Sequence, residues 1–364
     1  MNKRANRIIV SIIFVLLTAV MTQAQDDGSQ AYYCAMDSEV SADAPGSCPK
    51  CGMALIQGKR PTRIKVGIFI FNNIQILDFT GPYDVFAFKS KVFEVFTIGE
   101  NMKPIETSYG LSVNPKYTFE NCPQPDVLII PGGGVSKELA KENVIEWIAR
   151  TAEKSQYVMS VCTGSFLIAK AGLLQGKSAT TYNSAISSLR TLFPDIRVVS
   201  DQRYVDNGKV LTSAGISSGI DLSFHLITKM KGLGVAQEVA LGLEYDWKPN
   251  SDYVRAALAD RKLPRVGKLP EDFDWQVLGT AGNRESWQLS GLLRTDKSIH
   301  ETMQAIYAGV QADSTWQFNK GFDDTFMLTG WKLDTDGQSW ENKISVEKSS
   351  EANGYLVKMV LAKN

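Results

Sequence analysis

Short apolar runs separated by helical patterns are the feature that most limits how this chain can fold. Four of them read RIKVGIFIF (63–71), FEVFTIG (93–99), DVLIIPGGG (126–134) and YVMSVCTGS (157–165). Runs of this kind, several ending in Gly or Pro, are typical of parallel strands buried on both faces. Between two of them, residues 135–154 place apolar side chains at helical spacing. The sequence therefore predicts an α/β fold in which helices sandwich a parallel sheet.

The rest of the chain divides around this domain, which we expect to span residues 63–247. Within it, Asn207-Gly208 lies between two extended runs and predicts a β-hairpin. Residues 248–272 include a stretch rich in Lys, Arg and Pro and are expected to be a linker. Residues 273–364 alternate apolar and polar positions around one helical segment. They predict a small α+β domain of unknown role on an antiparallel sheet.

The first residues have the layout of a secretory signal peptide. Lys3, Arg4 and Arg7 precede the apolar run 8–21, and small and polar residues follow it. This run is too short to be a good membrane span. We therefore expect a signal peptide at 1–24, a periplasmic or secreted protein, and no stable membrane span after cleavage. An uncleaved anchor is the alternative.

Charge and cysteine counts narrow the function classes further. The 364 residues include 39 Lys and Arg and 39 Asp and Glu, so the formal net charge is +0. Neither sign forms a long run, which argues against a nucleic-acid-binding surface. Five cysteines are an odd number for an exported chain, so at least one thiol is left for chemistry or for a metal.

Cys162 is the strongest candidate for a reactive residue. It lies where the strand expected at 157–161 meets a helix expected to begin near Gly164, at the carboxyl end of the strand, where ligands of α/β sheets collect. Small residues after it, beginning with Thr163, allow the sharp turn of a nucleophile elbow. We expect the helix N-terminus to lower the pKa of the thiol and so to favour the nucleophilic thiolate.

Two further segments are expected at the same edge of the sheet. The turn Pro131–Gly134 could bring the amides of Gly132 and Gly133 close to a substrate and form an oxyanion hole with the amide of Thr163. A plain strand-to-helix turn is the alternative. Asp78 is a carboxylate among apolar residues in LDFTGPYDVF. Beside a cysteine its pKa would rise and it could act as an acid or base; a surface turn is the ordinary alternative.

These motifs resemble the ThiJ/PfpI family of class I glutamine-amidotransferase-like proteins over about residues 63–245. The stretches LDFTGPYDVF, PGGG, VCTGSFLIAKAGLLQG and SAGISSGIDLSFHL resemble most the branch that contains isonitrile hydratases and the sensor domains of AraC-type regulators. The resemblance implies a flavodoxin-like sheet, homodimerisation and catalytic positions at Asp78, Cys162 and Thr163. If the activity is that of an isonitrile hydratase, the resemblance implies that Cys162 attacks the terminal carbon of the isonitrile and that Asp78 transfers the proton. No cofactor is implied for catalysis.

One position departs from the family pattern. Relatives commonly carry ATTHW after the elbow, whereas this chain has ATTYN, so Tyr182 stands where a histidine would complete a Cys-His pair. We assign Tyr182 to substrate binding. Of the two histidines in the chain, His225 is expected to be a packed core residue rather than a base. A Cys-His-acid triad is therefore not expected.

A cysteine-rich segment at 30–57 precedes the large domain. Cys34 is followed by Cys48 and Cys51, which form the C-P-x-C-G pattern of a metal knuckle. The segment resembles the heavy-metal-binding module of copper ATPases and efflux adaptors, in which a histidine stands at the position of Asp37. We expect Zn or Cu at Cys34, Cys48, Cys51 and Asp37. A Cys48–Cys51 disulfide is the alternative.

The sequence therefore predicts a cysteine-dependent enzyme acting on a small electrophilic molecule, with isonitrile hydratase as the leading activity. The alternative from another class is a non-catalytic periplasmic sensor of metal or oxidant. A DNA-binding regulator is not favoured, because the chain has an export signal, lacks net basicity and shows no helix-turn-helix pattern after residue 247.

Overall fold

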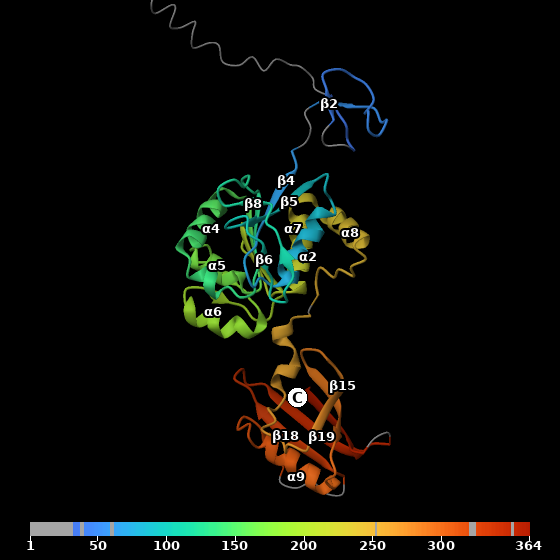
Figure 1. Ribbon diagram of the computed structural model, residues 1–364. Helices are drawn as coiled ribbons and strands as arrows, with labels where there is room; N and C mark the ends of the chain where they lie inside the picture. The colour runs from blue at the N-terminus through green and yellow to red at the C-terminus, as the bar shows by residue number, and fades with distance from the viewer. Residues whose placement is uncertain (1–31, 37–39, 59–61, 252, 320–324, 351–352) are drawn as a thin grey trace, which may run out of the picture. The chain divides into compact units, whose positions relative to one another are not determined.

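The computed structural model describes residues 32–36, 40–58, 62–251, 253–319, 325–350 and 353–364. The predicted signal peptide at 1–24 lies outside these ranges. The chain divides into two compact units, residues 1–63 and 64–364, which are described separately (Figure 1). Within the described ranges no helix has both the length and the apolar character needed to cross a membrane.

The first unit contains a small antiparallel sheet of order β2-β1-β3. Its strands are β1 (Tyr32–Tyr33), β2 (Ser41–Ala42) and β3 (Ile56–Gln57). Between β2 and β3, the Cys48 amide donates to the Met53 carbonyl at 2.7 Å, and the Gly52 amide donates to the Cys48 carbonyl at 2.8 Å. These two bonds close a tight turn, which brings Cys48 and Cys51 to one place.

A seven-stranded sheet of order β13-β14-β10-β9-β4-β5-β8 forms the centre of the second unit. Its strands are β4 (Ile64–Phe69), β5 (Phe93–Gly99), β8 (Tyr117–Thr118), β9 (Val127–Ile130), β10 (Tyr157–Val161), β13 (Tyr204–Asp206) and β14 (Val210–Ser213). All neighbours are parallel except β13 and β14, which form the hairpin expected around Asn207-Gly208. The predicted parallel sheet is confirmed, and the carboxyl ends of β4, β9, β10 and β14 share one edge.

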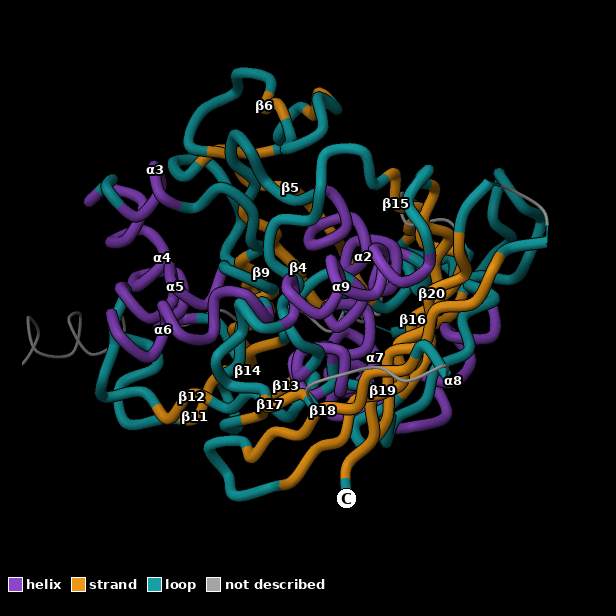
Figure 2. The backbone as a smooth tube through the Cα atoms, turned by 90° about the horizontal axis from the view of Figure 1, so that it is seen from below, coloured by secondary structure: helices purple, strands orange, loops and turns teal. Residues whose placement is uncertain are grey.

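Helices cover both faces of this sheet. One face carries α2 (Ile76–Ala87), α7 (Ser217–Lys231) and α8 (Leu233–Gly242), and the other carries α3 (Ser136–Leu139), α4 (Glu142–Lys154) and α5 (Gly164–Lys170) (Figure 1). The single helix expected at 135–154 is therefore wrong: the extended backbone of Lys141 separates α3 from α4. Figure 2 shows β9, β4 and β5 side by side.

Smaller elements complete the second unit up to residue 247. They are β6 (Ile105–Glu106), β7 (Ser112–Val113), β11 (Ser178–Ala179), the 3-10 helix η1 (Asn183–Ala185), α6 (Ile186–Leu192) and β12 (Arg197–Val198). β6 pairs with β7 antiparallel, and β11 pairs with β12 parallel.

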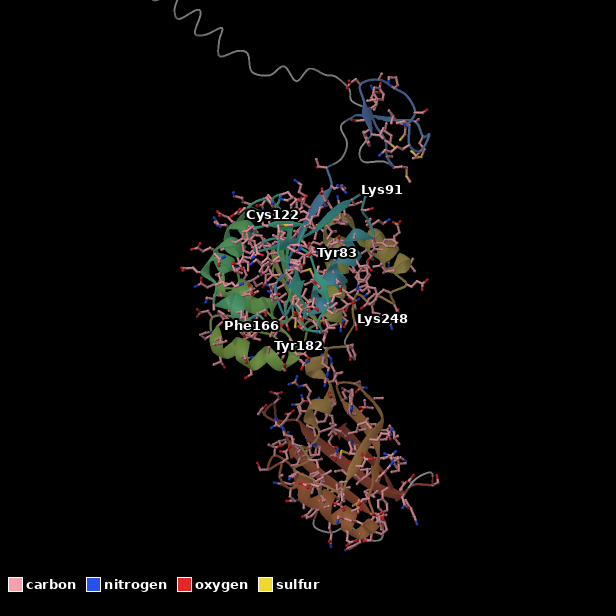
Figure 3. The ribbon with its side chains drawn as sticks, viewed as in Figure 1. Tyr83, Lys91, Cys122, Phe166, Tyr182 and Lys248 are labelled. Carbon is pink, nitrogen blue, oxygen red and sulfur yellow. The ribbon has the colours of Figure 1, made fainter. Side chains whose placement is uncertain are left out.

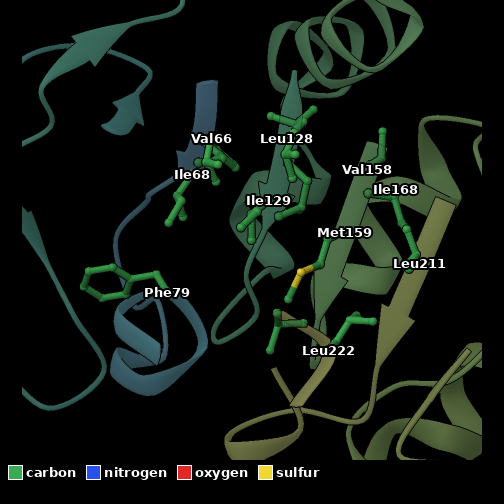
Figure 4. Packing of buried hydrophobic residues seen from close by; sticks show 14 of the residues in the cluster. Val66, Ile68, Phe79, Leu128, Ile129, Val158, Met159, Ile168, Leu211 and Leu222 are labelled. Atoms are coloured by element: carbon green, nitrogen blue, oxygen red, sulfur yellow. The ribbon is translucent and has the colours of Figure 1, made fainter. Parts of the chain in front are cut away.

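Aliphatic side chains of the central strands form the core. Val66, Ile129 and Val158 come from three neighbouring strands and are completely buried (Figure 4). Burying a side chain of this size stabilises a fold by roughly 1.5–3 kcal/mol. The central strands carry few polar residues because both of their faces are covered, which explains the continuous apolar runs in the sequence.

Residues after 273 form a second sheet, which is antiparallel throughout and has the order β15-β16-β20-β19-β18-β17. Its elements are β15 (Asp274–Gly282), β16 (Ser286–Arg294), α9 (Ile299–Val310), β17 (Gln317–Phe318), β18 (Met327–Leu333), β19 (Ser339–Lys348) and β20 (Tyr355–Lys363). The Ser298 hydroxyl and the Glu301 side chain form a capping box at the start of α9. This domain has its own apolar core, and the predicted α+β architecture is confirmed.

The segment expected to be a linker is partly folded. It contains the 3-10 helices η2 (Arg255–Ala257) and η3 (Ala259–Lys262). Val254, Leu258 and Ala259 are buried, so this part of 248–272 is packed rather than solvated. Isolated apolar residues in a charged segment carry no periodic signal, which is why the sequence pattern did not reveal this packing.

Candidate active site

Cys162 occupies a strained turn between β10 and α5. Its φ is 58°, a left-handed value that few residues other than glycine adopt. A Cβ added at Gly215 would lie 3.0 Å from the Cys162 Sγ, and one added at Gly164 would lie 2.1 Å from the Ile130 carbonyl oxygen. Gly164 and Gly215 must therefore both be glycine, because a side chain at either position would collide with atoms at the elbow. The predicted elbow geometry is present, and such local strain is typical of functional positions.

Asp78 reaches the same place from the first turn of α2. Its side chain is completely buried, and it is not the surface residue that was the ordinary alternative. One carboxylate oxygen accepts the Ile216 amide at 2.8 Å, and the other accepts the Gly132 amide at 3.2 Å. Burial raises the pKa of Asp78 to about 6, although these hydrogen bonds oppose the shift. The group can therefore exchange a proton near neutral pH.

The Cys162 thiol does not have the lowered pKa that its position suggested. Burial and the neighbouring Asp78 carboxylate raise its pKa well above the usual range, while hydrogen bonds from Thr163 oppose the shift. The helix behind it, α5, spans only seven residues, so its dipole is small compared with the cost of a buried negative charge. At neutral pH the proton therefore stays on sulfur, beside the Asp78 carboxyl.

The glycine turn supports the site without offering free donors. The Gly132 amide donates to Asp78, and the Gly133 amide donates to the Thr163 hydroxyl oxygen at 2.9 Å. That hydroxyl in turn donates to the Gly133 carbonyl at 3.0 Å. The expected oxyanion hole from these two amides is therefore wrong for this conformation, because both already have partners. The glycine turn instead fixes the positions of two side chains beside Cys162: Gly132 holds Asp78, and Gly133 holds Thr163.

Ile216 is a contributor that the sequence reasoning missed. This residue precedes α7, has a φ of 52° and donates its amide to Asp78. A β-branched residue at positive φ is a genuine outlier, which the surrounding structure must enforce. The stretch SAGISSGID, quoted for the resemblance, contained both Ile216 and Gly215. Their φ values, which sequence patterns do not provide, define their roles.

Tyr182 lines a cavity of about 240 Å³ beside the elbow, together with Gly215 and Ile216. Its side chain is 36% exposed, so the ring is available to a bound molecule. The hydroxyl of Thr181, the residue before Tyr182, donates to the Cys162 carbonyl at 3.0 Å. This bond ties the segment after β11 to the elbow. Tyr182 and Cys122 lie at opposite ends of the α/β domain, so Cys122 is remote from this cavity (Figure 3).

The predicted core histidine is placed differently. His225 is half-exposed, and its Nε2 lies 2.9 Å from the Asp206 carboxylate, which also pairs with Lys229. The expectation that His225 packs in the core is therefore wrong. It occupies the more open face of α7, and the helical periodicity of that segment did not distinguish the two faces.

The cysteine-rich segment brings three thiols together. The ligand atoms of Cys34, Cys48 and Cys51 lie within 4.8 Å of one another, and Cys34 Sγ lies 3.5 Å from Cys51 Sγ. All three are free thiols, so the alternative Cys48–Cys51 disulfide is not formed. Asp37, the proposed fourth ligand, lies outside the described residues. Three thiolates converging from two segments fit a soft or borderline cation such as Cu(I) or Zn²⁺.

The first domain of the second unit is a flavodoxin-like α/β domain with a cysteine on a strand-to-helix elbow. Residues 64–229 match the DJ-1/PfpI family, and residues 31–57 match the heavy metal binding domain. Isonitrile hydratase of Pseudomonas putida is 39% identical over 193 residues, which cover 52% of this chain and 82% of that enzyme. The chain belongs to the DJ-1/PfpI family, as its motifs indicated.

Transcriptional regulators are also among its relatives. The HTH-type transcriptional regulator CdhR of Pseudomonas aeruginosa is 26% identical over 178 residues, which cover 48% of this chain. The chain spans about half of that regulator, 52% of its length. The crystal structure of a ThiJ/PfpI family protein from Pseudomonas syringae shares 25% identity, with a TM-score of 0.48, and is matched over 53% of this chain and 79% of that one.

Proposed function

We propose that this protein hydrates isonitriles to N-substituted formamides, with Cys162 as nucleophile and Asp78 as the group that moves the proton. The observation that carries the proposal is the buried pair formed by the Cys162 thiol and the Asp78 carboxyl, each of which shifts the pKa of the other. The similarity to the isonitrile hydratase of Pseudomonas putida supports the choice of substrate.

The pair can perform this reaction without a histidine. As Cys162 Sγ attacks the terminal carbon of R–N≡C, Asp78 takes the thiol proton and delivers it to that carbon, which gives a thioimidate, R–N=CH–S–Cys. Water then adds across the C=N bond, with its proton going to nitrogen. The C–S bond breaks, the hydroxyl proton returns through Asp78 to sulfur, and R–NH–CHO leaves. One water is consumed for each isonitrile, and nothing is oxidised or reduced.

The proton affinities of the two groups suit this sequence. With a pKa of about 6, Asp78 is mostly a carboxylate at pH 7 and can accept the thiol proton as the S–C bond forms. The raised pKa of the thiol means that a thiolate does not accumulate before the substrate binds. Asp78 therefore activates the thiol as a general base during the attack, whereas a Cys-His pair would hold a preformed thiolate.

A second function, sensing of metal or oxidant without turnover, is favoured by one separate observation. The cluster of Cys34, Cys48 and Cys51 forms a site in a unit that is distinct from the catalytic domain. These residues would hold Zn²⁺ or Cu(I), and the cation would crosslink β1 to the Cys48–Cys51 turn. Its role there would be structural or regulatory.

The remaining features of the proposal rest on the sequence. The charged and apolar N-terminal pattern supports export to the periplasm or beyond, and the family resemblance supports a homodimer. The balanced charge supports a small molecule, rather than nucleic acid, as the ligand of Cys162.

The test uses the mature chain and two variants. The chain is incubated with cyclohexyl isonitrile, and formamide is measured by NMR, beside Cys162→Ser and the matched Cys122→Ser control. We expect formamide from the wild type and Cys122→Ser and none from Cys162→Ser. Metal content is measured on the same samples. Absence of formamide from all three proteins, together with stoichiometric metal, would favour the sensor and reject the hydratase.

A further inference from the structure

The cavity beside Cys162 has an outer wall that comes from beyond the family domain. Its inner side is formed by Tyr182, Gly215 and Ile216, which adjoin the elbow. Its outer side is formed by Tyr253–Ala256, in the segment that the sequence suggested was a linker. The match to the family model ends at residue 229, so this wall lies outside the residues that the model matches.

A buried ion pair ties the outer wall to the domain. Arg203 pairs with Asp221, and the two side chains are only 11% and 9% exposed. The same guanidinium donates to the Tyr253 carbonyl at 3.0 Å and to the Ser217 hydroxyl at 3.2 Å. Each end of the planar fork thus has its own acceptor, a geometry that lysine cannot reproduce.

Two further contacts fix the wall in place. Val254 is 3% exposed, so the segment docks through an apolar side chain. Arg261, in η3, donates to the Asn183 side-chain oxygen at 3.1 Å, next to Tyr182 in the chain. The segment is therefore anchored to two residues that line the cavity, Arg203 and Asn183.

The charges around the cavity are neutralised. Its two lining arginines, Arg203 and Arg255, are each paired with an aspartate, Asp221 and Asp260 respectively. The remaining lining residues are tyrosines, small residues, one asparagine, serines and aliphatics. A surface of this kind suits an uncharged molecule with a compact apolar group that packs on the tyrosine rings.

We propose that Tyr253–Ala256 form the outer wall of the cavity that adjoins Cys162 through Gly215 and determine which molecules reach the thiol, with Arg203 as the positioning residue that holds them. The wall favours small uncharged molecules and excludes bulky ones. If the proposed hydration is correct, it selects isonitriles by the size of the nitrogen substituent, and this last step alone rests on the proposed function.

Alkylation of Cys162 tests the wall without assuming any enzymatic activity. The full mature chain is treated with iodoacetamide, which is small, or N-phenylmaleimide, which is bulky, and the Cys162 peptide is quantified by mass spectrometry. In Tyr253→Ala and Arg203→Lys we expect the N-phenylmaleimide rate to rise about tenfold, equivalent to ~1.4 kcal/mol in the barrier. The iodoacetamide rate should change much less. Trp331→Ala, an exposed aromatic on β18 outside the cavity lining, is the matched control.

Each outcome decides the proposal. Equal N-phenylmaleimide rates in the wild type and in folded Tyr253→Ala would overturn the proposal that this segment restricts access. A rise in Trp331→Ala as large as that in Tyr253→Ala would also overturn it. Because Tyr253 is 53% exposed, its variant remains a test even where Arg203→Lys fails to fold. A selective rise in a chain that hydrates no isonitrile would support the wall and reject only the proposed function.

The size selection is read from kinetics. With methyl and cyclohexyl isonitrile as substrates, Tyr253→Ala should lower KM for the bulkier cyclohexyl compound several-fold, because the shortened wall no longer excludes it. The methyl compound should keep its KM, and kcat should be unchanged for both. A uniform fall in kcat for both compounds would contradict a role limited to substrate selection.

Discussion

The Asp78 carboxylate accepts the amide of Ile216, a residue 138 positions later in the chain, at 2.8 Å. The bond brings the first turn of α2 and the residue before α7 to the same carboxylate, beside Cys162. Ile216 holds a positive φ of 52° with a ψ of −117° at this point, a sparsely populated conformation that costs on the order of 1–3 kcal/mol. A charge-assisted hydrogen bond to a buried carboxylate offsets that cost.

Asp78→Asn should abolish most of the proposed hydratase activity, because asparagine cannot accept the thiol proton. General acid–base groups contribute roughly 10²- to 10⁴-fold, so we expect a fall of that size in kcat. Formamide release followed by NMR measures it, and Asp206→Asn, a carboxylate in the exposed pair with His225, is the control. Equal losses in both variants would show that charge removal, not proton transfer, causes the effect.

Activity should rise with pH through the pKa of Asp78. The carboxylate form is the base, and its pKa is about 6, so the rate should fall below pH 6 and level off above it. A pH profile of kcat/KM checks this limb. A profile that rises only with thiol ionisation, at alkaline pH, would contradict the assignment of Asp78 as base.

The same group should make stability depend on pH in an unusual direction. The pKa of Asp78 is raised from 3.8 to about 6 on folding, so the native state binds the proton more tightly than the unfolded state. Its contribution is fully present below pH 4 and is lost as pH rises toward 6, by ~3 kcal/mol. Urea unfolding at pH 4 and 6.5 should show this loss in the wild type but not in Asp78→Asn. Equal losses in both would attribute it to other groups.

Gly215→Ala should inactivate the protein, because the new Cβ would lie 3.0 Å from Sγ and 2.8 Å from the Cβ of Cys162. A displacement of this order at the nucleophile costs about 100-fold in rate. Gly172→Ala is the matched control: its φ is also positive, at 79°, but no atom lies within 4 Å of the added Cβ. Gly172→Ala should lose only ~1 kcal/mol of stability and keep its kcat. Equal losses of kcat would assign the effect to backbone strain alone.

Sequence patterns predicted the framework of the site because each part has a local signature. The buried strands lack polar alternation, and Cys162 is followed by the small residues that a sharp turn needs. The environment of the thiol was not predictable in the same way. Its raised pKa depends on burial and on Asp78, which the fold brings from 84 positions earlier in the chain.

The glycine turn and the outer wall show the same limit. Gly132 and Gly133 were correctly expected near the elbow, but whether their amides are free depends on partners in other segments. The docking of Tyr253–Ala256 depends on a few isolated contacts, among them the hydrogen bond from Arg203 to the Tyr253 carbonyl, and such contacts leave no periodic signal in the sequence. Local patterns thus specify strands and turns, while charge states and occupied donors arise from long-range contacts.

Loss of one thiol from the N-terminal cluster should abolish tight metal binding while the catalytic domain continues to function. Cys34, Cys48 and Cys51 supply three ligands from two segments, so Cys48→Ser leaves two thiols, too few to enclose the cation. Bound zinc or copper, measured by mass spectrometry after dialysis, should fall from near one per chain to near zero. Cys122→Ser, a partly buried thiol outside the cluster, should keep its metal and its activity. Equal metal content in Cys48→Ser and the wild type would show that the cation binds elsewhere. Loss of formamide production in Cys48→Ser would show that the activity depends on the N-terminal unit.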